Sequence, residues 1–411
     1  MNIIMKLQAR PYQLDAINWL KTNRRGILTD VPGLGKTLQA SEAATRPVMV
    51  ICPTYLVGQW EEFLVEQYPE DKVVACTGTK AERLKLLATK ADWHIINIEM
   101  LRTFPMPVVK TIIIDEAHRV KGHNSIQAIA AQRYAEGATY VYLLTATPTK
   151  REVDDWYMLL RIVAPRVFTS YWAFVDTHCN VKHEEFRDRI QGAKYPKLFE
   201  RMLRKYTLGR TYANVGIQVP PLIETTVPIR PGKEFYKIYN KLRKQYTLED
   251  IQIESPMEVY SLLRQMTMSF EKLDAVTQLV EDNGPAVIFC WYRNSAQLIG
   301  EHLGIPIITG EMNADERRKV AKAAQASIAV TIASLSEGID LTQYRNIIFA
   351  EEDYTPGSTY QAVCRVRRPS DNLDPVRVYY PIVLGTIDSV VRRAVQVRKS
   401  SIREIIKEAL R

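Results

Sequence analysis

The sequence predicts an α/β fold in which two doubly wound parallel sheets follow one another along the chain. Short apolar runs alternate with helical patterns in both halves, and this alternation is typical of parallel sheets. The chain has 411 residues, which is enough for two or three domains. The expected strands are residues 26–28, 48–52, 73–76, 94–97, 111–115 and 140–144 in the first half, and 286–290, 305–308, 328–332 and 346–350 in the second.

Two segments interrupt the alternation and divide the chain. We expect an N-terminal domain at residues 1–222, with a helical insertion near 165–215, and a C-terminal domain at 223–411, with a helical insertion near 232–270. Residues 218–221 (Gln-Val-Pro-Pro) have the composition of a linker. The first insertion mixes aromatic and basic residues, which suits either phosphate contacts or an amphipathic helical hairpin with an aromatic core.

The composition limits the partners and the compartment. A net charge of +9 and a pI of about 9.1 favour a polyanionic partner, although a solvated basic face would give the same count. The five cysteines are widely spaced without a CxxC pair, so we expect reduced thiols inside a cell, in the cytoplasm. No apolar stretch is long enough to span a membrane, so a membrane partner is not expected.

Residues 29–37 (Thr-Asp-Val-Pro-Gly-Leu-Gly-Lys-Thr) have the pattern of a phosphate-binding loop. A short strand enters a turn with two glycines, and Lys36 and Thr37 open a helix whose N-terminus favours anions. Lys36 would reach the β- and γ-phosphates of a nucleotide, and the Thr37 hydroxyl would hold Mg²⁺. The loop Pro32, Gly33, Leu34, Gly35, Lys36 and Thr37 is therefore the predicted nucleotide site.

Two acidic residues end the apolar run 111–114. Carboxylates at the carboxyl end of a buried strand lie where α/β folds bind ligands. Asp115 would hold Mg²⁺, and Glu116 would orient and deprotonate the attacking water. A strand end with two solvated acids is the alternative interpretation.

Three further positions outside the loop are candidates. Gln13 begins a helical segment ahead of the loop, and its amide can both donate to and accept from adenine. Arg365 and Arg368 are three residues apart, so on a helix they would share a face and could clamp a γ-phosphate. A basic turn of a surface helix would have the same spacing.

The motifs occur in a specific order that covers nearly the whole chain. They are Arg-Pro-Tyr-Gln (10–13), the phosphate loop (30–37), Cys-Pro-Thr (52–54), Asp-Glu-Ala-His (115–118), Leu-Thr-Ala-Thr-Pro (144–148), Gly-Ile-Asp (338–340) and Gln361 with Arg365 and Arg368. This ordered set resembles the superfamily-two helicase-like motors, and within them the Swi/Snf family of DNA translocases. Residues 349–362 are similar to the annealing-helicase branch of that family.

The resemblance implies two RecA-like lobes with ATP and Mg²⁺ between them. It implies that Gln13 reads adenine, that Glu116 is the catalytic base and that Arg365 and Arg368 are arginine fingers, with Gly338 and Asp340 also near the nucleotide. It further implies DNA contacts on both lobes, at Pro53, Thr54, Trp60, Thr145, Trp291, Tyr292 and Ser334.

The resemblance therefore predicts an ATP hydrolase that moves along duplex or branched DNA. The chain departs from the family in two places: Asp-Val-Pro precedes Gly33 where the family has Asp-Glu-Met, and Pro369 and Ser370 follow Arg368 where the family often has Ile-Gly-Gln. A strand-separating DNA or RNA helicase, the motor of a repair or restriction assembly whose partner supplies targeting or nuclease activity, and an ATP-switched binding module are the alternatives.

Overall fold

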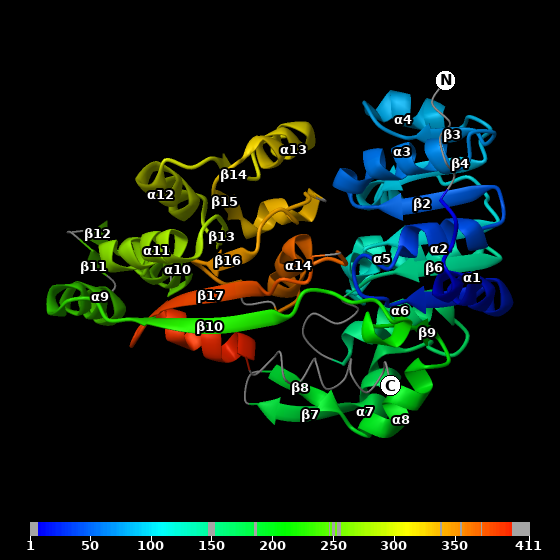
Figure 1. Ribbon diagram of the computed structural model, residues 1–411. Helices are drawn as coiled ribbons and strands as arrows, with labels where there is room; N and C mark the ends of the chain where they lie inside the picture. The colour runs from blue at the N-terminus through cyan, green and yellow to red at the C-terminus, as the bar shows by residue number, and fades with distance from the viewer. Residues whose placement is uncertain are drawn as a thin grey trace. The chain divides into compact units, whose positions relative to one another are not determined.

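The computed structural model describes residues 7–146, 153–184, 187–245, 247–248, 251–252, 256–337, 339–353, 356–370 and 372–396. The chain forms two compact units, which divide between Ile217 and Gln218. This division lies ahead of the predicted boundary at residue 222, because the strand that begins at Leu222 pairs within the second unit. Each unit is described below by itself (Figure 1).

Unit 1 contains a seven-stranded sheet in the order β3-β4-β2-β5-β6-β1-β9, in which all neighbours pair in parallel. The strands are β1 (Arg25–Leu28), β2 (Val48–Cys52), β3 (Val73–Ala75), β4 (Trp93–Asn97), β5 (Thr111–Asp115), β6 (Tyr140–Leu144) and β9 (Thr207–Leu208). The helices are α1 (Pro11–Asn23), α2 (Lys36–Ala43), α3 (Val57–Gln67), α4 (Lys80–Leu87), α5 (Ile126–Glu136), α6 (Asp155–Val163), α7 (Tyr171–His178) and α8 (Pro196–Leu203).

The unit 1 sheet has a hydrophobic core on each face. Successive residues of β5 alternate between the two, since Ile112 and Ile114 belong to one cluster and Ile113 to the other. A strand that is covered on both faces must be apolar throughout, which explains the continuous run 111–114. Helices α5 and α6 supply the first cluster, and α1 and α3 supply the second.

Unit 2 contains a six-stranded parallel sheet in the order β10-β17-β16-β13-β15-β14. The strands are β10 (Leu222–Ile229), β13 (Ala286–Cys290), β14 (Ile307–Ile308), β15 (Ile328–Thr331), β16 (Asn346–Phe349) and β17 (Val376–Val383). The helices are α9 (Lys233–Gln245), α10 (Pro256–Met266), α11 (Phe270–Asn283), α12 (Arg293–Leu303), α13 (Ala314–Ala323) and α14 (Pro356–Val366). The predicted fold class, two doubly wound parallel sheets, is confirmed.

The sequence pattern predicted a helical first insertion, but the insertion also contains strands. Between α7 and α8 the chain forms an antiparallel hairpin of β7 (Cys179–Glu184) and β8 (Arg187–Ala193). The second insertion contains α9 and α10 with a short hairpin of β11 (Thr247–Leu248) and β12 (Ile251–Gln252) between them. In the part of the chain that the structure describes, no helix is both long enough and apolar enough to cross a bilayer.

Candidate nucleotide-binding site

Three neighbouring strands of unit 1 end in register at one edge of the sheet. Leu28 of β1 pairs with Leu144 of β6, and Leu144 pairs in turn with Asp115 of β5. The loop 29–37, the pair Asp115-Glu116 and Thr145 all leave the sheet at this edge. Carboxyl ends of parallel strands are the usual place for ligands in α/β folds, so the register itself assembles the predicted site.

The two glycines of the loop have the left-handed backbone that the predicted turn requires. Gly33 has a φ of 84° and Gly35 a φ of 78°, a region that side chains with a Cβ rarely adopt. A Cβ on Gly35 would also lie 2.3 Å from Nε2 of Gln13. Helix α2 then begins at Lys36, so the positive end of its dipole lies at the loop.

The Lys36 side chain folds back onto the loop. Its Nζ donates to the carbonyl oxygen of Asp30 at 2.7 Å. Burial raises the pKa of Asp115, and the Lys36 charge offsets a small part of that rise. Lys36 therefore lies between the loop and the acidic pair, where the phosphates of a nucleotide would place their negative charge.

Asp30 ties the start of the phosphate loop to the segment that follows β9. The carboxylate is fully buried, and Oδ1 accepts from the Arg210 backbone N–H at 2.9 Å and from the Arg210 Nε at 3.0 Å. Gln39 donates to the other oxygen, Oδ2, at 3.2 Å. The sequence alone does not predict this role for Arg210, because 180 residues separate the two partners. Tyr212 adds a bond from the same segment to the carbonyl oxygen of Pro32.

Gln13 lies under the loop. Its Nε2 donates to the Leu34 carbonyl oxygen at 3.0 Å, and its Oε1 accepts from the Arg10 backbone N–H at 2.8 Å. The side chain is 7% exposed, so in this structure the amide shapes the loop. Adenine recognition by Gln13 stays a prediction.

Asp115 is held by two donors. The indole N–H of Trp60 donates to Oδ2 at 3.0 Å, and the Glu116 backbone N–H donates to Oδ1 at 2.8 Å. Burial, with a smaller contribution from the neighbouring Glu116 charge, raises the pKa of Asp115 to about 6. A cation at this position would relieve both effects, and the carboxylate and the Thr37 hydroxyl are the hard oxygen donors that Mg²⁺ prefers.

Glu116 has a strained backbone with a φ of 48°, which is uncommon for a residue with a side chain. Its Oε2 lies 3.0 Å from Nδ1 of His118, and the same nitrogen lies 3.3 Å from Oγ1 of Thr145. His118 thus connects the predicted base to the end of β6. Strain of this kind is often found at functional sites.

Four of the seven residues predicted to contact DNA are buried: Pro53, Trp60, Thr145 and Ser334. These four side chains therefore expose little surface to a duplex in this structure, and their contacts with DNA stay a prediction. The polar groups of three of them have protein partners instead: Asp115 for Trp60, His118 for Thr145, and the Thr331 carbonyl oxygen for Ser334. Thr54 is exposed, and Trp291 and Tyr292 are half-buried.

A buried carboxylate positions the Trp291-Tyr292 turn of unit 2. Oε2 of Glu351 accepts both backbone N–H groups of the turn at 2.9 Å, and Oε1 accepts from the Ser295 hydroxyl at 2.8 Å. The Arg264 guanidinium lies over both rings, 5.8 Å from the Trp291 centroid and 5.7 Å from that of Tyr292. Sequence reasoning missed Glu351 and Arg264, although Glu351 lies at the end of an apolar run, like Asp115.

The two predicted arginine fingers do not share a helical face. Helix α14 ends at Val366, so Arg365 is in its last turn and Arg368 lies beyond it. The Arg368 Nε donates to the Cys364 carbonyl oxygen at 3.3 Å, which keeps the side chain against the helix end. Gly338 lies outside the described residues, and Asp340 is exposed and accepts from the Thr342 backbone N–H at 3.1 Å.

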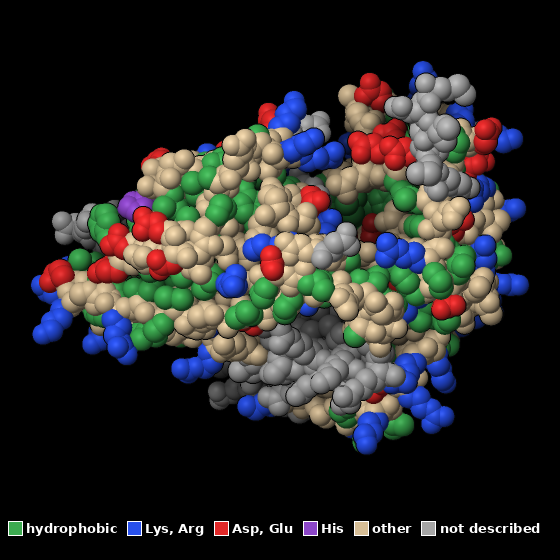
Figure 2. All heavy atoms as spheres, viewed as in Figure 1, with side chains coloured by type: hydrophobic (Ala, Val, Ile, Leu, Met, Phe, Trp, Pro, Cys, Tyr) green, Lys and Arg blue, Asp and Glu red, His purple; other side chains and the backbone are tan. Residues whose placement is uncertain are grey.

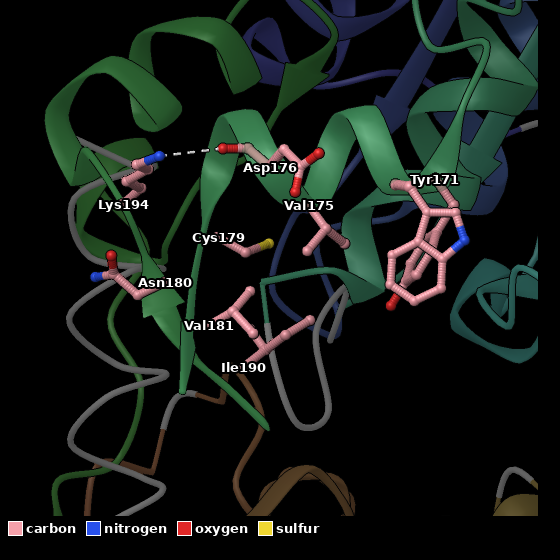
Figure 3. A pocket seen from close by; sticks show the side chains of 9 residues that line it. Tyr171, Val175, Asp176, Cys179, Asn180, Val181, Ile190 and Lys194 are labelled. Atoms are coloured by element: carbon pink, nitrogen blue, oxygen red, sulfur yellow. Dashed lines mark hydrogen bonds between the residues drawn. The ribbon is translucent and has the colours of Figure 1, made fainter. Parts of the chain in front are cut away.

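A cavity of about 460 Å³ lies in the first insertion, and none of the predicted site residues lines it. Tyr171, Trp172, Val175 and Ile190 surround it, and Lys194 donates to the Asp176 carbonyl oxygen at its side (Figure 3). The Tyr171 ring stacks on His123 at 3.6 Å. The insertion therefore packs against the segment that follows the Asp115-Glu116 turn.

Comparison with known proteins shows two family models that match this chain and several similar proteins. A model of the SNF2-related domain matches residues 12–274, and a model of the helicase conserved C-terminal domain matches residues 271–370. Chromodomain-helicase-DNA-binding protein 1-like of Mus musculus is 25% identical over 94% of this chain and 49% of its own length. The DNA annealing helicase and endonuclease ZRANB3 of Homo sapiens is 23% identical over 94% of this chain and 39% of its own length.

The solved structures include a Sulfolobus solfataricus SWI2/SNF2 ATPase core in complex with dsDNA. It is 20% identical to this chain, with a TM-score of 0.48 over 98% of this chain and 93% of that one. The chain spans about half the length, or less, of the two curated relatives described above.

The chain is a two-unit α/β protein with a glycine-containing loop between β1 and α2. Because the SNF2-related domain matches well over half of its length, the chain belongs to the SNF2-related family of helicase-like proteins. The resemblance seen in the sequence is thereby confirmed.

Proposed function

We propose that this chain is an ATP-hydrolysing motor that moves along double-stranded DNA. The observation that carries the proposal is the register of β1, β6 and β5, which brings the phosphate loop, Asp115-Glu116 and Thr145 to one sheet edge. Family membership supports the same activity, and the basic net charge of +9 suits a polyanionic track.

In this proposal the residues of unit 1 bind the nucleotide and orient water. The loop N–H groups and Lys36 would neutralise the phosphates, and Glu116, oriented by His118, would accept a proton from the attacking water. Thr37 and Asp115 would hold Mg²⁺, which supplies positive charge to the phosphate oxygens when bound. Trp60 would fix the rotamer of Asp115 through its indole N–H.

Unit 2 would supply Arg365 and Arg368 to the γ-phosphate. Arginines that are provided across a cleft stabilise the charge of the transition state. The proposed cycle alternates between closure of the units around ATP and opening after hydrolysis, and DNA bound to both units would favour closure. We propose that Thr54 in unit 1 and Trp291 and Tyr292 in unit 2 are the contacts to DNA.

The test is the steady-state ATPase rate with no nucleic acid, blunt duplex DNA, single-stranded DNA or RNA, with Glu116→Gln as the blank. Stimulation mainly by duplex DNA supports the proposal. Stimulation mainly by single strands or RNA would instead indicate a strand-separating helicase, and near-normal turnover in Glu116→Gln would show that the site is assigned wrongly.

A further inference from the structure

Helix α9 carries a row of lysines on one face. Lys233, Lys237, Lys241 and Lys244 are spaced by four, four and three residues, so they lie within about a quarter of the helix circumference. All four are exposed. Figure 2 shows Lys and Arg side chains projecting around α9 at the left edge of the view.

The opposite face of α9 is firmly anchored in unit 2. Tyr239 and Leu242 are buried against α10, and the Tyr239 hydroxyl accepts from the Ile387 backbone N–H at 2.8 Å. The Tyr236 hydroxyl donates to the Leu384 carbonyl oxygen at 2.8 Å. The lysine row is therefore held on a fixed support at defined spacing.

Little within α9 offsets these charges. The helix contains one acidic residue, Glu234, which lies 3.4 Å from Lys237. Both side chains of that pair are more than 70% exposed, so the pair adds little stability. Like charges four residues apart destabilise an isolated helix. Attraction to an external row of negative charges would offset the repulsion between the lysines.

The lysine row and the Trp291-Tyr292 turn both follow the carboxyl ends of strands in the unit 2 sheet. Strands β10 and β13 belong to one parallel sheet, and α9 follows β10 as the turn follows β13. Helix α10, which packs on α9, reaches the turn through the Ser261 hydroxyl, 3.2 Å from the Tyr292 hydroxyl. A strand of nucleic acid that touched the turn could therefore continue along α9.

We propose that the α9 lysine row binds the phosphate backbone of duplex DNA at a place separate from the motifs of the nucleotide site. From Lys233 to Lys244 the helix rises about 16 Å, and one strand of B-DNA places about five phosphates over that length. The row reads no bases, so it would hold the track regardless of sequence. This inference rests on the proposed function, because it assumes that duplex DNA is the track.

The experiment measures the affinity for a fluorescent blunt duplex as a function of salt, in the full chain. Replacing the four lysines by glutamine should reduce the slope of log K against log salt by about 2 to 4, because each lost phosphate contact removes about 0.9. At about 0.1 M salt this corresponds to at least tenfold weaker binding. The same four positions changed to arginine should retain the wild-type slope.

The matched control changes four exposed lysines of unit 1, Lys72, Lys80, Lys85 and Lys90, to glutamine. The net charge falls equally, so a similar loss of slope in the control would overturn the proposal. An unchanged slope in the α9 glutamine variant would also overturn it, while duplex-stimulated ATPase activity in the wild type would leave the proposed function standing. If the wild type failed to bind duplex DNA at all, both proposals would fall.

Discussion

Trp60, which the family resemblance implies is a DNA contact, is buried in the structure and donates a hydrogen bond to Asp115. Trp60→Phe keeps an aromatic ring against Phe63 but removes the N–H that Asp115 accepts at 3.0 Å. A lost bond to a carboxylate costs about 1–3 kcal/mol, so we expect the ATPase rate without DNA to fall about tenfold. Steady-state kinetics would measure this change.

The control is Trp172→Phe, since Trp172 is 67% exposed and has no role in the proposed chemistry. If Trp60→Phe weakened DNA binding and left the DNA-free rate unchanged, a direct contact with DNA would be the better explanation.

Glu351 of unit 2, like Asp115 of unit 1, is a carboxylate that follows an apolar run and accepts hydrogen bonds from its neighbours. Glu351→Ala would leave two backbone N–H groups and the Ser295 hydroxyl without their acceptor. We expect a loss of about 3 kcal/mol in the unfolding free energy of unit 2, measured by urea titration of tryptophan fluorescence. Glu301→Ala, an exposed change on α12, should stay within about 0.5 kcal/mol of the wild type; equal stabilities of the two variants would refute the positioning role.

At the scale of elements, the segment after β9 is tied to the phosphate loop. Arg210→Met would break the buried pair with Asp30, and leaving one buried charge unpaired costs about 3–5 kcal/mol. We expect lower thermal stability and weaker binding of a fluorescent ATP analogue, because the loop loses its support. Arg204→Met, at a half-exposed pair with Glu200, serves as the control and should change neither.

The elements that sequence analysis identified are those with local signals. Continuous apolar runs such as 48–52 and 111–114 locate central strands, because these strands are covered on both faces. Strands β10 and β17 were missed, since β10 is exposed over most of its length and contains Pro228. The hairpin β7–β8 was missed because charged residues hide its alternation.

In the candidate site, too, the sequence predicted the residues that lie in local motifs and missed those that act through distant contacts. The residues that are proposed to contact phosphate or water lie in short motifs, so the phosphate loop and Asp115-Glu116 could be identified directly from the sequence. Their supports could not: Arg210, Glu351 and Arg264 act over distances of 60 to 180 residues in sequence, and only tertiary packing reveals such pairs.

At the scale of the whole molecule, the proposed cycle requires both units. Arg365→Ala should leave ATP binding nearly unchanged and lower the maximal ATPase rate about 10³-fold, because an arginine finger acts mainly in the transition state. The measurement combines equilibrium nucleotide binding with single-turnover hydrolysis on duplex DNA. Arg393→Ala, an exposed change in the same unit, should behave as the wild type; a purely binding defect in Arg365→Ala would contradict the assignment.

The position of β9 has a consequence for how this chain could change over time. Strands β6 and β9 flank β1 on opposite sides, so the chain leaves the sheet after β6 and returns to it on the other side of β1. The segment between β6 and β9 is therefore an insertion into a sheet whose other strands pair without it. Its length and surface residues can change during evolution, or be exchanged by protein engineering. Arg210 and Tyr212 would still hold the end of the segment against the phosphate loop through their bonds to Asp30 and Pro32.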